Sequence, residues 1–170
     1  MSAVFKKLNL QEQTEIAIVN APASFEPEIA ALRGVAVRRS LAGGGQVAFS
    51  LAFVTKQPEV DALAKAIARQ TAGDAVVWLA YPKQSSKNYK SEIDRDHGWA
   101  PLGAAGFEPV RMVAIDDDWS ALRFRRAGFI KTLSRPAEYA LSKAGKAQAG
   151  AEPRHKSPVP GKPRGRKPKR

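Results

Sequence analysis

Cysteine is absent from this sequence of 170 residues. The chain can therefore form neither a disulfide bond nor a thiolate metal site. It also has no run that approaches the ~18 apolar residues of a membrane span. The first seven residues lack the apolar stretch of a signal peptide. Together these absences predict a soluble, cytoplasmic protein with no membrane span.

Acidic residues are nearly missing from the last 28 positions, which carry ten lysines and arginines against one glutamate. The net charge of this segment is 10 − 1 = +9, out of a formal +12 for the chain. Residues 1–142 hold the remaining charges, at 18 − 15 = +3. From residue 144 onward the chain is mostly Ala, Gly, Pro, Lys and Arg, which cannot bury enough apolar surface to fold. We therefore expect one folded domain over 1–142 and a disordered basic tail over 143–170.

The basic tail predicts contact with a nucleic acid, because a polycation releases condensed counterions when it meets a phosphate backbone. Its end resembles an AT-hook, in which a glycine between two arginines lets the backbone lie in the narrow minor groove of A·T-rich DNA. Lys167 departs from that pattern, where proline would normally follow the second arginine. DNA is favoured over RNA, and nucleoid association would follow. The alternative is a solvated tail that contacts any polyanion. The residues expected to bind nucleic acid are Lys162, Arg164, Gly165, Arg166, Lys167, Lys169 and Arg170.

The folded part alternates apolar runs with amphipathic segments. The run at 75–81 is continuous and is typical of a strand buried on both faces. After Pro58, apolar residues recur at i, i+3, i+4 and i+7, which predicts a helix that ends near Gly73. Other expected strands lie within 15–22, 35–39, 46–54, 110–115 and 119–125, and other expected helices within 27–32 and 91–105. This order predicts an α/β, three-layer, Rossmann-like sandwich whose mostly parallel sheet ends in an antiparallel edge hairpin.

Several motifs resemble a bacterial family of uncharacterised proteins, domain of unknown function 3052. They are Trp78–Lys87, Arg95–Trp99, Gly106-Phe107, Ala114–Phe124 and Asn20-Ala21-Pro22. The resemblance spans roughly Leu10 to Arg126 and leaves the basic tail outside. It implies a compact Rossmann-like fold and brings no catalytic residues.

A loop of lysines and serines follows the most apolar strand. Ligands of open α/β sheets bind beyond the carboxyl ends of the strands, where Asn20 would emerge from the first strand. Lys83, Ser85, Ser86 and Lys87 offer ammonium and hydroxyl groups that could hold a phosphate. We therefore expect an anion site formed by Asn20, Lys83, Ser85, Ser86 and Lys87. The alternative is a solvated loop with helix-capping serines.

Catalytic and metal sites have weaker signals. Ser85 or Ser86 would need a positioned base to act as a nucleophile, and His97 is the only histidine before the tail. Asp94, Asp96 and His97, or the run Asp116–Asp118, could ligate a metal, but a charged hairpin turn and a solvated loop are the commoner explanations. Trp78, Trp99 and Trp119 lie in apolar patterns and are expected in the core. No catalytic residue, metal or cofactor is therefore expected.

These observations predict a non-enzymatic, nucleic-acid-associated protein whose tail binds DNA and whose domain binds an anionic ligand or a protein partner. The alternative is a small-molecule-binding protein, or an enzyme that acts on a phosphate-bearing ligand at the crevice between Asn20 and Lys83–Lys87. A third hypothesis is a structural adaptor that docks a partner on its sheet.

Overall fold

The computed structural model describes residues 2–130 and 141. The boundary expected at 142/143 and the predicted nucleic-acid-binding residues Lys162–Arg170 lie outside the described residues.

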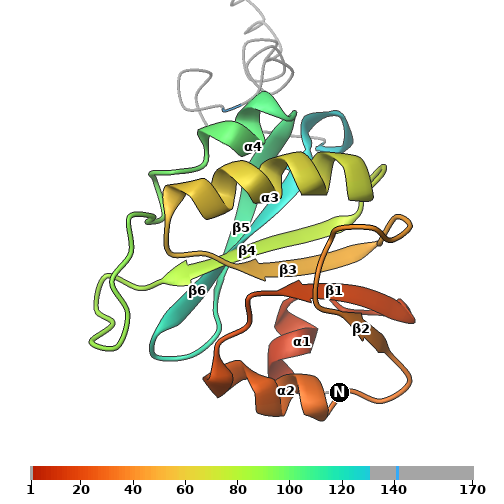
Figure 1. Ribbon diagram of the computed structural model, residues 1–170, viewed down its shortest axis with the longest axis horizontal. Helices are drawn as coiled ribbons and strands as arrows, with labels where there is room; N and C mark the ends of the chain where they lie inside the picture. Colours follow the sequence, from red (N-terminus) through yellow and green to blue (C-terminus); the bar gives the residue numbers. More distant parts are fainter. Residues whose placement is uncertain (1, 131–140, 142–170) are drawn as a thin grey trace, which may run out of the picture.

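A six-stranded sheet forms the centre of the domain, in the order β2-β1-β3-β4-β6-β5 (Figure 1). The strands are β1 (Glu15–Val19), β2 (Ala36–Arg38), β3 (Phe49–Phe53), β4 (Val76–Pro82), β5 (Phe107–Ala114) and β6 (Trp119–Arg126). β2, β1, β3 and β4 are parallel, and β6 pairs antiparallel with both β4 and β5. The predicted α/β, Rossmann-like sheet with an antiparallel hairpin at one edge is confirmed.

Strand side chains alternate between two hydrophobic cores because successive residues point to opposite faces of a sheet. In β4, Trp78 and Ala80 belong to one core, while Val77, Leu79 and Tyr81 belong to the other. All seven residues of β4 are buried. Burial on both faces explains why this strand reads as one continuous apolar run in the sequence.

Helices cover both faces of the sheet (Figure 1). They are α1 (Ala3–Lys7), α2 (Glu26–Ala30), α3 (Gln57–Gln70) and α4 (Ala100–Ala104), with short 3-10 turns η1 (Ala23–Phe25) and η2 (Ala127–Phe129). α3 and α4 pack on the Leu79 side of β4, and α1 and α2 pack on the Trp78 side. The expected three layers are thus present.

The N-terminal helix α1 was not predicted from the sequence. It is only five residues long, and an isolated helix of that length is unstable in water. Tertiary contacts hold it, since Phe5 is fully buried and the Trp78 indole N–H donates to the Leu8 carbonyl at 2.7 Å.

α3 confirms the strongest helix prediction. Its buried face consists of Val60, Leu63, Ala64 and Ile67. At its start, Glu59 Oε1 accepts hydrogen bonds from the backbone N–H groups of Thr55 and Lys56, both at 3.1 Å. A carboxylate at this position satisfies N–H groups that have no partner within the helix.

Helix α4 occupies the end of the segment in which a helix was expected. The sequence predicted a helix within 91–105, but only Ala100–Ala104 is helical. The preceding residues form a loop whose side chains bond to the local backbone, a competitor of helix formation for Ser and Asp. Leu141 packs on this helix, because a Cβ added at Gly103 would lie 2.5 Å from the Leu141 carbonyl oxygen.

Among residues 2–130 and 141, no helix has the length and apolar character to cross a membrane.

Candidate functional site

Two clefts lie along the edge of the sheet where the parallel strands end. One lies at the end of β1 and the other at the end of β4. β3 separates these two strands in the sheet order, so β1 and β4 are roughly 10 Å apart at a spacing of about 4.8 Å per strand. This is the edge at which open α/β sheets bind ligands.

The cleft at the end of β4, called here the polar cleft, has a volume of about 520 Å³. Positively charged, negatively charged and hydroxyl-bearing side chains all line it. Its lining residues are Tyr81, Lys83, Gln84, Ser85, Asp94, Arg95, Asp96, His97 and Ser120.

Tyr81 and Ser120 are the most buried residues of the polar cleft. They are paired across β4 and β6, and their exposed fractions are 4% and 7%. The Tyr81 hydroxyl donates to Met112 Sδ at 3.1 Å. Burial raises the pKa of Tyr81, so its hydroxyl stays protonated and can donate a hydrogen bond at neutral pH.

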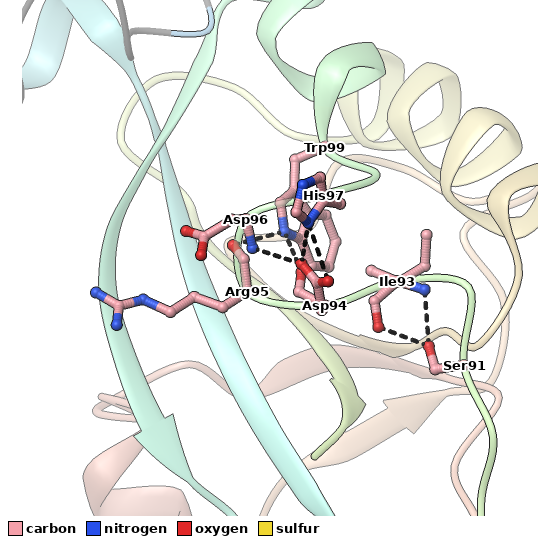
Figure 2. A network of polar contacts seen from close by, with 7 residues as sticks. All are labelled: Ser91, Ile93, Asp94, Arg95, Asp96, His97 and Trp99. Carbon is pink, nitrogen blue, oxygen red and sulfur yellow. Dashed lines mark hydrogen bonds and ion pairs between the residues drawn. The ribbon is translucent and has the colours of Figure 1, made fainter. Parts of the chain in front are cut away.

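Asp94 organises one wall of the polar cleft (Figure 2). The two Asp94 oxygens lie 2.7 and 2.9 Å from His97 Nδ1, and the Asp96 N–H donates to Asp94 Oδ1 at 2.9 Å. Burial alone would raise the pKa of Asp94, but the hydrogen bonds from Asp96 and His97 outweigh it and hold this pKa below its ordinary value. A carboxylate can only accept, so His97 Nδ1 carries a proton, and Nε2 is left for another partner.

Trp99 fixes the backbone of this wall. Its indole N–H lies 2.9 Å from the Asp94 carbonyl and 3.1 Å from the Arg95 carbonyl (Figure 2). Its ring is 3% exposed and packs against Tyr81 and Phe124 with centroid distances of 5.7 and 5.3 Å. The loop that carries Asp94 and His97 is therefore anchored in the hydrophobic core.

The loop after β4 is held by Asp118. The Ser86 hydroxyl donates to Asp118 Oδ1 at 2.7 Å and accepts the Tyr89 N–H at 3.2 Å. The Lys83 N–H donates to the Asp118 carbonyl at 2.7 Å. Ser86 therefore shapes the loop and does not line the polar cleft, and Lys87 is exposed outside it.

The second cleft, called here the switch-point cleft, lies where the chain passes from β2 on one side of β1 to β3 on the other. Its volume is about 460 Å³. The end of β1, the loop after β2 and the first turns of α3 form it. Its lining residues are Val19, Asn20, Ser40, Leu41, Ala42, Pro58, Glu59, Ala62, Leu63 and Ala66.

The expected anion site is therefore divided between two places. Lys83 and Ser85 line the polar cleft, whereas Asn20 lines the switch-point cleft on the other side of β3. The expectation of one crevice between Asn20 and Lys83–Lys87 needs this correction. All these residues lie at the edge of the sheet where the parallel strands end. The distance between two of them also depends on how many strands separate their own strands in the sheet.

No cluster of three or more potential metal-ligating residues occurs among residues 2–130 and 141. Asp116 Oδ1 instead accepts the N–H groups of Asp118 and Trp119, both at 2.8 Å, and forms the turn between β5 and β6. Trp78, Trp99 and Trp119 are at most 3% exposed, as the apolar patterns predicted.

Tyr81, Arg95 and Ser120 are cleft residues that the sequence did not single out. Tyr81 could have been identified from the sequence, because its hydroxyl stands at the end of the apolar run that precedes the lysine loop. Ser120 gives no local signal, because only the antiparallel pairing of β6 with β4 brings it beside Tyr81.

No protein-family model matches this chain, and no curated protein is significantly similar to it. Membership of the domain of unknown function 3052 family therefore stays a prediction.

Solved structures with a similar arrangement include several methyltransferases. A ribosomal protein methylase from Lactobacillus delbrueckii subsp. bulgaricus aligns with a TM-score of 0.46 and 8% identity, over 72% of this chain and 74% of that chain. Magnesium protoporphyrin IX methyltransferase from Synechocystis, solved with bound SAM, aligns with a TM-score of 0.43 and 13% identity, over 72% and 74%. N-methyltransferase NodS from Bradyrhizobium japonicum aligns with a TM-score of 0.42 and 10% identity, over 71% and 91%.

These neighbours contradict the main functional expectation. The chain was expected to be a non-enzymatic, nucleic-acid-associated protein, whereas the three proteins described above are methyltransferases, which are enzymes. The alternative expectation, a small-molecule-binding protein or enzyme, agrees better with them. At this level of identity the likeness concerns the fold and transfers neither reaction nor substrate.

Proposed function

We propose that this domain is a small-molecule-binding protein or enzyme that takes a phosphate-bearing ligand in the polar cleft. The observation that carries the proposal is that Lys83, Arg95 and His97 line one cleft together with Tyr81 and the hydroxyl-bearing Ser85. Lysine and arginine are the side chains that bind phosphate best, and hydroxyl groups add hydrogen bonds to its oxygens.

The two acidic residues of the polar cleft limit which phosphate-bearing ligands can bind there. Asp94 is already engaged by His97 and by the Asp96 N–H, so its charge is largely compensated. The Asp96 carboxylate still opposes an anion, but it can accept hydrogen bonds from hydroxyl or amino groups. A ligand that joins a phosphate to such donor groups, as sugar phosphates do, suits this mixture better than inorganic phosphate alone.

The Asp94–His97 pair supports an enzyme within this proposal. A histidine whose Nδ1 is held by a carboxylate presents Nε2 in a fixed orientation, the arrangement used for general-base catalysis. His97 would then take a proton from a bound ligand or from water through Nε2. Asp94 would stabilise the resulting imidazolium ion.

S-adenosylmethionine, which one of the neighbours holds, does not fit the residues at the end of β1. A ribose-bearing cofactor at that place is held by a glycine-rich turn and by an acidic residue some 20 positions further on. Here the turn from Asn20 to Phe25 contains no glycine, and Pro22 has no N–H to donate. The end of β2 presents Arg38 and Arg39 in place of an acid. No step is therefore assigned to this cofactor.

The proposal is tested by thermal melting with a panel of sugar phosphates, on the wild type and on Lys83→Met and Lys87→Met. A ligand that binds the folded state raises the melting temperature by mass action. We expect this rise in the wild type and in Lys87→Met, because Lys87 lies in the same loop outside the cleft. It should be lost in Lys83→Met. An equal rise in both variants, or no rise with any ligand, would refute the proposal.

A second measurement separates an enzyme from a binding protein. Phosphorus NMR would follow the conversion of any stabilising ligand by the wild type and by His97→Gln. An enzyme should convert the ligand, and His97→Gln should keep the thermal shift while losing the conversion.

A further inference from the structure

We infer that the switch-point cleft is a second ligand site, and that it takes a neutral molecule with an apolar body and one hydrogen-bonding group. This site is separate from the polar cleft and independent of the function proposed for it. Its volume of about 460 Å³ lies within the range of ~300–1,000 Å³ that is usual for small-molecule sites.

The lining of the switch-point cleft is mostly apolar. Leu41 and Leu63 are 3% and 7% exposed, and both belong to the core that packs under α3. Val19 and Ala66 pack against that core from the end of β1 and from α3. These side chains are fixed by the fold, so the apolar surface is preformed and a ligand need not reorganise it.

The charges exclude an anion from this cleft. None of the residues that line it is a lysine or arginine, and Glu59 is the one charged residue among them. Glu59 Oε1 is occupied by N–H groups of Thr55 and Lys56 and by the Thr55 hydroxyl at 3.2 Å. The two arginines nearby in sequence are engaged elsewhere, since Arg38 donates to the Gly45 carbonyl and Arg39 forms a two-bond ion pair with Glu26.

Asn20 supplies the hydrogen-bonding group at the mouth of the cleft. Its backbone has a φ of +58°, in the left-handed region that asparagine adopts more readily than most residues other than glycine. Its side chain is exposed and makes no hydrogen bond with any other described residue. The amide can both donate and accept, so it suits an amide, a carbonyl or an alcohol.

The test compares benzamide with benzoate, which have the same ring and nearly the same size but differ in charge. Binding is followed by the amide chemical shifts of Val19, Asn20, Leu41 and Leu63 in the full-length protein. Benzamide should shift these signals saturably. Benzoate should bind at least tenfold more weakly, because Glu59 repels it and no cation compensates.

Two leucine substitutions on α3 provide a matched pair. Ala66→Leu fills the cleft and should abolish the benzamide shifts. Ala68→Leu places the same side chain on an exposed part of the same helix and should leave them unchanged. Alanine and leucine both favour helices, so α3 should form in each variant.

Asn20→Gly tests the role of the side-chain amide. Glycine adopts a positive φ without strain, so the backbone should keep its conformation, and the loss of the amide should weaken benzamide binding.

Equal binding of the two probes, undiminished binding in Ala66→Leu, or shifts confined to residues 81–97 would overturn the assignment. The same conclusion would follow if benzamide caused no saturable shift at all. Each of these outcomes leaves the thermal test of the polar cleft unaffected, because that test depends on Lys83.

Discussion

The nearest hydrogen-bond partner of a polar side chain decides whether that side chain can contact a ligand. Asp94 and His97 are exposed enough to meet a ligand, with side-chain exposed fractions of 33% and 77%, yet they hold each other at 2.7 Å. Ser86 shows the opposite case, because its hydroxyl is used up by Asp118 in forming the loop. Side chains of the same polar type thus serve ligand contact or local structure according to their nearest partner.

Gly103 lies at a place in α4 where the fold leaves no room for a side chain. A Cβ at this position would lie 2.5 Å from Leu141 Cβ and 2.5 Å from its carbonyl oxygen. Because part of the obstruction is backbone, the neighbour cannot rotate away. We expect Gly103→Ala to destabilise the fold by about 1–3 kcal/mol through overpacking, which outweighs the ~1 kcal/mol that alanine gains in a helix.

The measurement for Gly103→Ala is the free energy of unfolding in urea. Gly128→Ala is the control, because an added Cβ there meets nothing within 4 Å and the backbone φ is not positive. It should stay within ~0.5 kcal/mol of the wild type. Equal stability of the two variants would mean that Leu141 does not pack on α4.

At the scale of elements, short segments depend on contacts from elsewhere in the chain. The loop before α4 carries Asp94 and His97, and it is held by the Trp99 indole, whose ring lies in the core. α1 depends in the same way on the Trp78 indole, which caps the Leu8 carbonyl. Buried tryptophans thus position both segments through one polar atom each.

Trp99→Phe tests this role. The substitution keeps an aromatic ring but leaves the Asp94 and Arg95 carbonyls without the indole donor. Trp119→Phe is the matched control, because Trp119 is equally buried, at 3% exposed, and its indole nitrogen has no hydrogen-bond partner within the described chain. We expect Trp99→Phe to cost about 1–2 kcal/mol more stability than Trp119→Phe.

Amide hydrogen exchange gives the second readout for this pair. Exchange at residues 95–98 should become faster in Trp99→Phe and stay unchanged in Trp119→Phe. Similar costs and similar exchange in both variants would contradict the anchoring role of the indole N–H.

At the scale of the whole molecule, the domain places two unlike clefts on one edge of one sheet. The polar cleft follows β4 and is lined by positively and negatively charged side chains. The switch-point cleft follows β1 and is lined mainly by apolar groups. β3 keeps them apart. The two sites can therefore be tested, and altered, independently.

The basic tail beyond residue 142 should contribute little to the stability of this domain. We expect a chain truncated after Ser142 to melt within about two degrees of the full-length protein, because Leu141 and the core beneath it are retained. Adding Leu141→Ala to the truncated chain should lower the melting temperature by a few degrees, through the loss of partly buried apolar surface. Calorimetry of the three proteins would check this, and a large fall on truncation alone would show that residues after 142 stabilise the fold.

The sequence by itself determined the sheet strands, helix α3 and the two-sided burial of β4. These features are encoded locally, by apolar runs and by the helical spacing of apolar residues over a few consecutive positions. It also placed Asn20 and the lysine loop correctly at the carboxyl ends of their strands. It could not determine α1 or the extent of α4, whose few residues are stabilised by distant partners.

Only the tertiary structure decided the composition of the clefts. Asn20 and Lys83 are separated because β3 lies between β1 and β4, and strand order is a long-range property that no local pattern carries. Ser120 joins Tyr81 because β6 runs antiparallel beside β4. Leu141 lies beyond the last strand in the sequence, and yet it packs against Gly103 of α4. A side chain's neighbours across a sheet are set by the global packing of the core, so the chemistry of each cleft follows from the fold as a whole.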